Sequence, residues 1–273
     1  MIGSLRHVAL ASLRRSLISG ATLVTLAGCE ALPLPSLHPM GAVAADISAI
    51  TWTLIGLFGA IWIAMVVLFL VVALRPGPLA RPRTSTWAIW GGVVLPLGVS
   101  IPLFVWGAVV AHRVWPEGGP DVTRIEVLAY QWGWEFTYPD FPGAVSEDVL
   151  YLPARTDVEL SMRSRDVIHS VWIPRLAGKL DALPGYVGTL TLRADAPAVI
   201  EGQCAEFCGL GHTEMRFIVD IRTPEDHASA VQGLIDGTTP ATIAEVSDET
   251  LIAAQGAAIA ATRAPAAIEG LAR

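Results

Sequence analysis

Long apolar runs occupy the first part of the chain, and short alternating runs occupy the second. Residues 47–74 include 28 positions without a charge, and residues 87–111 include 25. Each run exceeds the roughly 20 residues that a helix needs to cross a hydrocarbon core of about 30 Å. We therefore expect two transmembrane helices, at 47–74 and 87–111, joined by a loop at 75–86.

The charges of that loop predict how the helices are oriented. The loop contains Arg75, Arg81 and Arg83 and no acidic residue. Loops rich in Lys and Arg stay on the cytoplasmic side of a membrane. Both segments that flank the helices should therefore face outward.

The N-terminal segment is typical of an export signal, since basic residues precede an apolar stretch over 17–27. It ends in Leu26-Ala27-Gly28-Cys29, which resembles a bacterial lipoprotein cleavage box. We expect residues 1–28 to be removed and Cys29 to carry lipid; a plain signal peptide with an incidental cysteine is the alternative. The proline-containing segment 29–46 is expected to be an extended tether.

Beyond the second apolar run, apolar and polar residues alternate in short stretches. Val158, Leu160 and Met162 alternate with polar neighbours, and similar runs follow to residue 222. A period of two, interrupted by Pro and Gly, is typical of an all-β antiparallel sandwich or barrel, here over 112–237. Thr223 to Asp226 predict the start of a helix, and Gly237 predicts its end. The Ala-rich tail, 238–273, receives no function.

Composition supports a membrane-bound chain that does not bind nucleic acid. Hydrophobic residues make up 53% and charged residues 16%, and the mean hydropathy is +0.53. The net charge is −7, whereas nucleic-acid binding requires a basic surface. Residues 113–240 contain 19 acidic and 10 basic residues, a net of −9. Such a domain suits a basic partner, although an acidic surface also simply maintains solubility.

Soft metal ligands gather between the last two predicted strands. Cys204, Cys208, His212 and Met215 lie within twelve residues, and thiolate, imidazole and thioether groups together favour copper. A second cysteine adds the chance to bridge two metals, and His169 is a candidate second imidazole. The alternatives are a disulfide, because the outer compartment is oxidising, and a structural zinc site.

The pattern Cys-x-Glu-x-Cys-Gly-x-x-His-x-x-Met, with a Val-Ile-His-Ser segment upstream, resembles subunit II of haem–copper cytochrome c oxidases. The resemblance extends from the first membrane helix to about residue 222. It implies a transmembrane helical hairpin followed by a cupredoxin-like β-sandwich or barrel. It also implies a bacterial inner-membrane protein whose C-terminal domain lies in the periplasm.

The resemblance implies a binuclear copper centre with six ligands. Two thiolates would bridge both copper ions, each imidazole would bind one ion, and a thioether and a main-chain carbonyl would be weak ligands. These groups belong to Cys204, Cys208, His169, His212, Met215 and Glu206. The Glu206 carboxylate would face the catalytic subunit and help to hold Mg²⁺, which prefers oxygen ligands.

The implied function is electron transfer from cytochrome c, through the copper centre, to the haem of the catalytic subunit. That subunit reduces O₂ to water in a proton-pumping oxidase, and the implied partners are subunits I and III. Trp132 would accept the electron from docked cytochrome c. The chain departs from the family at Gly133, where many relatives have an aromatic residue, and at residues 83–86, where relatives often have a glutamate.

The aromatic residues around Trp132 are otherwise expected to cover one face of a sheet. Acidic residues that are candidates for docking a basic partner are Glu135, Asp140, Glu147, Asp148 and Asp181. Competing functions are a quinol oxidase subunit II, which lacks the copper ligands, nitrous oxide reductase, a copper chaperone and a purely structural membrane subunit. The full ligand set and the two apolar runs favour the oxidase subunit.

Overall fold

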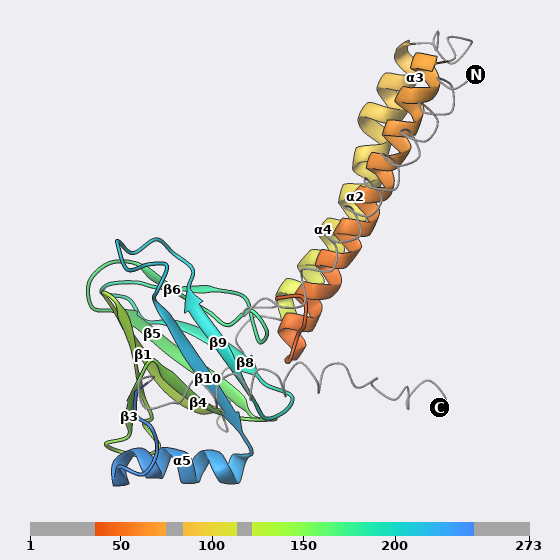
Figure 1. Ribbon diagram of the computed structural model, residues 1–273. Helices are drawn as coiled ribbons and strands as arrows, with labels where there is room; N and C mark the ends of the chain where they lie inside the picture. The colour runs from red at the N-terminus through yellow and green to blue at the C-terminus, as the bar shows by residue number, and fades with distance from the viewer. Residues whose placement is uncertain (1–35, 75–83, 114–121, 243–273) are drawn as a thin grey trace, which may run out of the picture. The chain divides into compact units, whose positions relative to one another are not determined.

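The computed structural model describes residues 36–74, 84–113 and 122–242 of the 273-residue chain. These residues form apolar helices and a β-sandwich (Figure 1). The predicted signal peptide 1–28, the lipidation site Cys29 and residues 29–35 of the predicted tether lie outside the described residues. Most of the predicted loop 75–86 and of the tail 238–273 also lie outside them.

Among the described residues, two helical segments are long and apolar enough to cross a membrane, Ala42–Leu74 and Ser85–His112. The first is the continuous helix α2 (Ala42–Leu74). Residues 42–46, predicted to belong to an extended tether, are therefore helical. Beyond Pro39 this stretch contains no proline and is rich in alanine, the strongest helix former, so the helix starts earlier than the charge-free run alone predicts.

The second helical segment changes its winding near its start. It consists of α3 (Thr84–Ile89), the π-helical turn η3 (Trp90–Val94) and α4 (Leu95–Arg113). Residues 84–86, predicted to lie in the loop, are helical. The turn η3 contains Gly91 and Gly92, and glycine's conformational freedom makes a local change of winding less costly.

Two five-stranded sheets form the sandwich (Figure 1). The first sheet has the order β3 (Val145–Glu147), β2 (Gly133–Thr137), β1 (Thr123–Tyr130), β5 (Asp157–Ser164), β8 (Gly188–Arg193). The second has the order β4 (Val149–Pro153), β10 (Arg216–Arg222), β9 (Ala198–Cys204), β6 (His169–Trp172), β7 (Leu180–Ala182). The predicted all-β sandwich is thus confirmed.

The predicted antiparallel pairing holds for most neighbouring strands but is wrong for two pairs. Strands β1 and β5 pair parallel in the first sheet, and β4 and β10 pair parallel in the second. Both parallel pairs join strands that are not consecutive in the chain. The alternation of apolar residues reports only which face of a strand is buried, so it does not reveal the direction of a distant neighbour.

The core lies between the two sheets. Val158, Leu160 and Met162 of β5 are buried, as their alternation predicts. From β2, the Trp134 ring packs edge-on against Phe217 of β10, with ring centroids 5.3 Å apart. These contacts join the sheets through apolar surface, which is the main source of stability in a sandwich.

Helix α5 (Pro224–Asp236) covers one end of the sandwich and contacts β4, β10 and β3 (Figure 1). Its predicted ends are confirmed: the Thr223 side chain accepts a hydrogen bond from the Asp226 amide, and Gly237 adopts a left-handed conformation with φ 68°. The chain stays on the domain beyond the predicted boundary at 237. The Pro240 carbonyl accepts a hydrogen bond from the Tyr151 hydroxyl at 2.7 Å, and Ala241 binds the Glu147 amide.

His227 of α5 gives the domain a predictable response to acid. It is buried beside Tyr138, with ring centroids 6.4 Å apart, and Asp220 and Arg222 are its charged neighbours. Burial lowers the pKa of its imidazole below the ordinary value. As the pH falls through about 6.5, His227 of the unfolded chain takes up a proton, whereas His227 of the folded domain resists it. The contribution of His227 to the stability of the fold should therefore be constant above that pH and fall below it.

We predict that His227→Phe makes the free energy of unfolding less dependent on pH between about 5 and 6.5, because no proton is then taken up on unfolding. Denaturant titrations of the full chain in detergent at several pH values measure this dependence. Glu225→Gln, which changes an exposed charge on the same helix, is the control and should keep the wild-type slope. An equally steep slope in His227→Phe would contradict the prediction.

Candidate metal centre

Three adjacent strands of the second sheet bring the predicted ligands to the end of the sandwich opposite α5. Cys204 ends β9, and Met215 immediately precedes β10. The Cys204 amide donates to the Met215 carbonyl at 2.9 Å, which closes the loop between these residues. His169 begins β6, whose Val171 is paired with Cys204. Local pairing therefore places residues 35 positions apart in one cluster.

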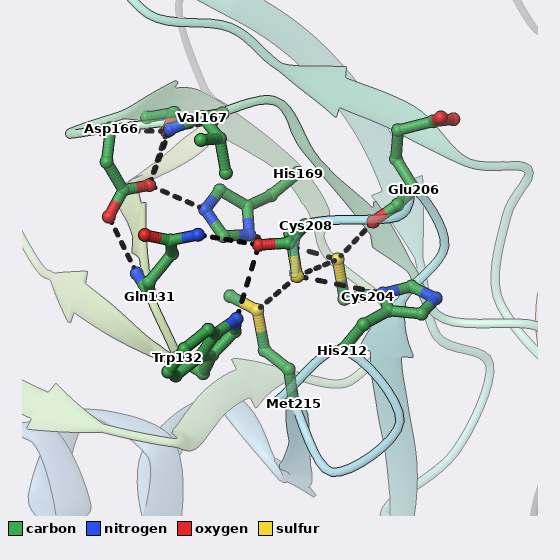
Figure 2. Close-up of polar contacts among 11 residues, drawn as sticks. Gln131, Trp132, Asp166, Val167, His169, Cys204, Glu206, Cys208, His212 and Met215 are labelled. Atoms are coloured by element: carbon green, nitrogen blue, oxygen red, sulfur yellow. Dashed lines mark hydrogen bonds and ion pairs between the residues drawn. The ribbon is translucent and has the colours of Figure 1, made fainter. Parts of the chain in front are cut away.

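The donor atoms of all six predicted ligands converge (Figure 2). The two thiol sulfurs are 3.8 Å apart. The Cys204 sulfur lies 3.9 Å from Nδ1 of His169 and 3.2 Å from the main-chain oxygen of Glu206. The Cys208 sulfur lies 3.6 Å from Nδ1 of His212 and 3.7 Å from the Met215 sulfur.

These separations fit metal ligands and not a disulfide. Both cysteines are free and buried, and a disulfide would require sulfurs about 2.05 Å apart. Ligand atoms at about 2.0–2.3 Å from one tetrahedral ion are separated from each other by roughly 3.3–3.8 Å. The observed separations of neighbouring donor atoms match this range closely, and the soft donor set fits copper.

The donors divide into two groups around the sulfur pair. In Figure 2, His169 and Met215 lie to one side of the sulfurs, and His212 and the Glu206 carbonyl lie to the other. Among the His, Cys, Asp and Glu residues that the structure describes, one group of three has ligand atoms that all lie within 4.8 Å of one another. It consists of His169, Cys204 and Cys208. His212 falls outside this set, so a single tetrahedral zinc with two cysteines and two histidines is disfavoured.

The cysteine thiols must lose their protons to bind metal. Burial raises the pKa of the Cys208 thiol to about 12, and the neighbouring Cys204 adds to the effect. A metal ion offsets this cost because it stabilises the thiolate directly. Without metal, Cys208 is therefore held in the protonated thiol form.

Glu206 presents two different groups in two directions. Its main-chain oxygen faces the Cys204 sulfur, whereas its carboxylate points away from the cluster (Figure 2). That carboxylate lies 3.3 Å from the Lys179 ammonium, which is also 3.8 Å from Asp181. The carboxylate is partly exposed and is therefore available to another molecule at this surface.

Trp132 lies in the turn between β1 and β2 of the first sheet. Its side chain packs against the loop between Cys204 and Met215. Its side chain is 45% exposed, and its indole N–H donates to the Cys208 carbonyl at 3.2 Å. The Gln131 amide side chain donates to the same oxygen at 2.7 Å. Trp134, by contrast, is completely buried and packs edge-on against His169 at 6.1 Å between ring centroids.

Gly211 is required for this contact with Trp132. A Cβ atom at Gly211 would lie 2.6 Å from Cγ and Cδ2 of the Trp132 ring. Gly209 and Gly211 both lie in the loop between Cys204 and Met215. Gly209 has a positive φ of 120°, a conformation that favours glycine. Gly211 does not, and the absence of a side chain there leaves room for the indole ring.

Asp166 and Gln131 are site residues that sequence analysis left without a role. The Asp166 carboxylate accepts a hydrogen bond from the main-chain N–H of Gln131 at 2.7 Å and lies 2.8 Å from Nε2 of His169. An acidic residue three positions before a candidate ligand is the signal that would have identified it, since metal-binding histidines usually donate their second N–H to such a group.

The predicted docking acids lie in different surroundings. Glu135 and Glu147 face each other across β2 and β3, and Asp148 accepts a hydrogen bond from the Trp134 amide at 2.8 Å. Burial raises the pKa of the nearby Tyr130, and these three carboxylates raise it further. They therefore concentrate negative charge beside the segment that contains Trp132. Asp140 is exposed in a turn, and Asp181 lies beside Lys179.

Comparison with known proteins places this architecture in a family. The family described as "Cytochrome C oxidase subunit II, periplasmic domain" matches residues 144–222, which include all six converging ligands. A cytochrome c oxidase subunit 2 from Alkalihalophilus pseudofirmus is 35% identical over 119 residues. Residues 144–222 thus belong to a family of subunit II periplasmic domains. The match to that relative covers 44% of this chain and 34% of the relative. The chain therefore spans about a third of the relative's length.

A longer match is to a quinol oxidase subunit 2 from Bacillus cereus, which is 28% identical over 227 residues, 78% of this chain and 76% of that protein. Among solved structures, the periplasmic domain of subunit II of cytochrome oxidase from Bradyrhizobium japonicum is 22% identical, with a TM-score of 0.41, over 45% of this chain and 99% of that one. The apolar helices and the periplasmic-domain match indicate that the protein is membrane-anchored and has an extracytoplasmic domain.

We predict that Gly211→Ala displaces the Trp132 ring, because the new methyl group and the rigid base of the indole cannot share this space. The indole N–H resonance of Trp132 should shift and its hydrogen exchange should accelerate, and overpacking should cost about 1–3 kcal/mol of stability. Gly178→Ala is the control, since the nearest atom to its Cβ would be 3.9 Å away. An unchanged Trp132 resonance in Gly211→Ala would refute the close contact.

Proposed function

We propose that this protein is subunit II of a cytochrome c oxidase, in which a binuclear copper centre accepts electrons from cytochrome c. The electrons pass to the haem of the catalytic subunit, which reduces O₂ to water in a proton-pumping complex. The observation that carries the proposal is the convergence of two thiols, two imidazoles, a thioether and a main-chain carbonyl on one site.

The donor set assigns a role to each residue. Cys204 and Cys208 would bridge two copper ions, and His169 and His212 would each hold one. Met215 and the main-chain oxygen of Glu206 would be weak ligands on the two sides of the sulfur pair. When bound, the copper pair supplies a one-electron carrier whose charge change is spread over both metals, so each bond changes little.

Trp132 is the proposed electron acceptor from cytochrome c. Its indole is exposed to solvent and at the same time bonded to the Cys208 carbonyl, on the residue that supplies one of the two sulfurs. Gln131 holds the same carbonyl from its other side. This arrangement gives a short bonded route from the surface to the ligands. Gly133 places no aromatic ring next to Trp132, so the route relies on Trp132 alone.

The surface beside Trp132 suits a basic protein such as cytochrome c. Glu135, Glu147 and Asp148 cluster near Tyr130, two residues before Trp132. Negative charge at that position attracts a positively charged partner and orients it toward the indole, an effect that weakens as salt rises. Asp140 and Asp181 are further candidates on the acidic domain.

The opposite side of the copper loop is the proposed contact with subunit I. The Glu206 carboxylate points away from the ligands toward that surface and would help to hold Mg²⁺ there. In this structure the Lys179 ammonium forms an ion pair with the Glu206 carboxylate. Binding of a divalent ion to the carboxylate would displace that ammonium. The proposed location is the bacterial inner membrane, with subunits I and III as partners, lipid on Cys29 and the β domain in the periplasm.

A quinol oxidase subunit 2 is the second candidate, because the match to such a protein covers 78% of this chain. The two functions require different chemistry at the end of the sandwich, since the quinol oxidase subunits lack the copper ligands. Copper binding and the electron donor that is used distinguish them. Two bound coppers and oxidation of cytochrome c support the first candidate, and quinol oxidation without copper supports the second.

We predict that Cys204→Ser and Cys208→Ser each abolish the binuclear centre, because a serine hydroxyl does not supply a bridging thiolate. Glu206→Ala is the matched control on the same loop and should retain copper, since alanine keeps the main-chain oxygen. Metal analysis and electron paramagnetic resonance of the purified chain measure both effects. Two coppers with an unchanged spectrum in Cys208→Ser would contradict the ligand assignment.

We predict that Trp132→Leu slows oxidation of cytochrome c by orders of magnitude, because the apolar contact remains but the indole and its bond to Cys208 are lost. Copper content and reduction by a small artificial donor should change little. Stopped-flow kinetics of the assembled oxidase measure the rate. Trp172→Leu, which removes a partly buried tryptophan from β6, is the control. Equal rates in wild type and Trp132→Leu would place electron arrival elsewhere.

A further inference from the structure

The two candidate ligand histidines meet the sulfur pair from different surroundings. The His169 ring is fully buried, and its Nε2 lies 2.8 Å from the Asp166 carboxylate. His212 is partly exposed and packs edge-on against Phe207. In the described part of the chain, no carboxylate lies within hydrogen-bond distance of the His212 ring, whose second nitrogen points away from the cluster in Figure 2.

Asp166 is held in place by more than its histidine partner. One of its oxygens accepts from the Gln131 amide and the other from the Val167 amide, each at 2.7 Å. The carboxylate beside His169 therefore has a fixed orientation.

We infer that Asp166 is a positioning residue that makes the two halves of the copper centre unequal. The inference rests on the proposed binuclear site. The carboxylate accepts a hydrogen bond from the Nε2–H group of His169. It thereby fixes the His169 tautomer and leaves the Nδ1 lone pair directed at the sulfurs. Its negative charge also makes this imidazole the stronger donor. The copper held by His169 therefore carries more of the positive charge of the oxidised centre than the copper held by His212.

The same carboxylate connects the ligand to the segment that contains Trp132. Asp166 binds the main chain of Gln131, and the Gln131 side chain and the Trp132 indole both bind the Cys208 carbonyl. One oxygen of Asp166 serves His169 and the other serves Gln131. An asparagine offers a single acceptor oxygen, so its NH₂ group would face one of these N–H donors. Asp166→Asn therefore removes both the charge and one of the two links.

The tautomer can be measured on the full-length chain in detergent without metal. In ¹⁵N NMR at a pH where the imidazoles are neutral, His169 should carry its proton almost entirely on Nε2, whereas His212 should be a mixture of tautomers. Asp166→Asn should shift His169 toward such a mixture. A wild-type His169 protonated on Nδ1 would overturn the inference directly, and this result does not depend on how any variant folds.

The charge effect is measured on the copper-loaded chain. Asp166→Asn should raise the reduction potential, because the oxidised state loses a stabilising negative charge, and should make the nitrogen hyperfine couplings of the two histidines more nearly equal. Asp166→Glu should restore much of the wild-type behaviour. Asp140→Asn, an exposed carboxylate in a distant turn, is the control and should leave both quantities unchanged.

The outcomes separate this inference from the proposed function. A two-copper spectrum in wild type with unchanged potential and couplings in Asp166→Asn overturns the role of Asp166 and leaves the copper function intact. A wild-type chain that binds no copper pair overturns the proposed function. A raised potential together with more equal couplings, absent in Asp140→Asn, supports the inference.

Discussion

The close approach of two unbonded thiols, 3.8 Å apart at one end of the sandwich, is the constraint on which the site depends. Neither cysteine reaches this position through local sequence alone. Cys204 is held by the pairing of β9 with β6 and β10, and Cys208 lies in the loop that the Cys204–Met215 hydrogen bond closes. The same strand pairing brings His169 beside them. The sheet thus assembles thiol and imidazole groups that are costly to bury unless they are paired.

The second sheet supplies only half of the environment. Trp134 of the first sheet packs against His169 from within the core, and Trp132 covers the loop from outside. Two tryptophans two residues apart therefore serve different purposes: the buried ring supports a ligand, and the exposed ring offers a route to solvent. Gly211 allows the exposed ring to approach the loop main chain, so a residue without a side chain determines how near the surface and the sulfurs lie.

Charge is arranged so that the two sides of the copper loop face different neighbours. Carboxylates gather near Tyr130 and Trp132 on one side, whereas Lys179 and Glu206 form an ion pair on another. The first surface suits the proposed basic electron donor, and the second suits the proposed divalent ion or neighbouring subunit. Between them, Asp166 contacts both the ligand His169 and the segment of Trp132. Binding, electron arrival and ligand orientation thus share a small number of residues.

Much of this protein follows from its sequence because the relevant forces are local. Charge-free runs predict membrane helices by length, alternation in β5 predicts its buried face, and Thr223 and Gly237 mark the ends of α5. The soft ligands between Cys204 and Met215 indicate copper because their chemistry and spacing are visible in one short segment. The earlier start of α2 follows from its alanine content and not from the charge-free run that was used to predict the helix. The attachment of residues 238–242 was not visible, since it depends on contacts with the distant Tyr151 and Glu147.

The tertiary structure alone decided how distant segments meet. The parallel pairing of β1 with β5 and of β4 with β10, the contact of Gly211 with Trp132, and the bond between Asp166 and His169 join residues whose relation no local pattern records. A repeating pattern identifies the face that a side chain occupies, but the partner across that face is chosen by the packing of the whole domain. The sequence by itself therefore determined which candidate ligands the site contains, and the fold determined which groups orient, cover and connect them.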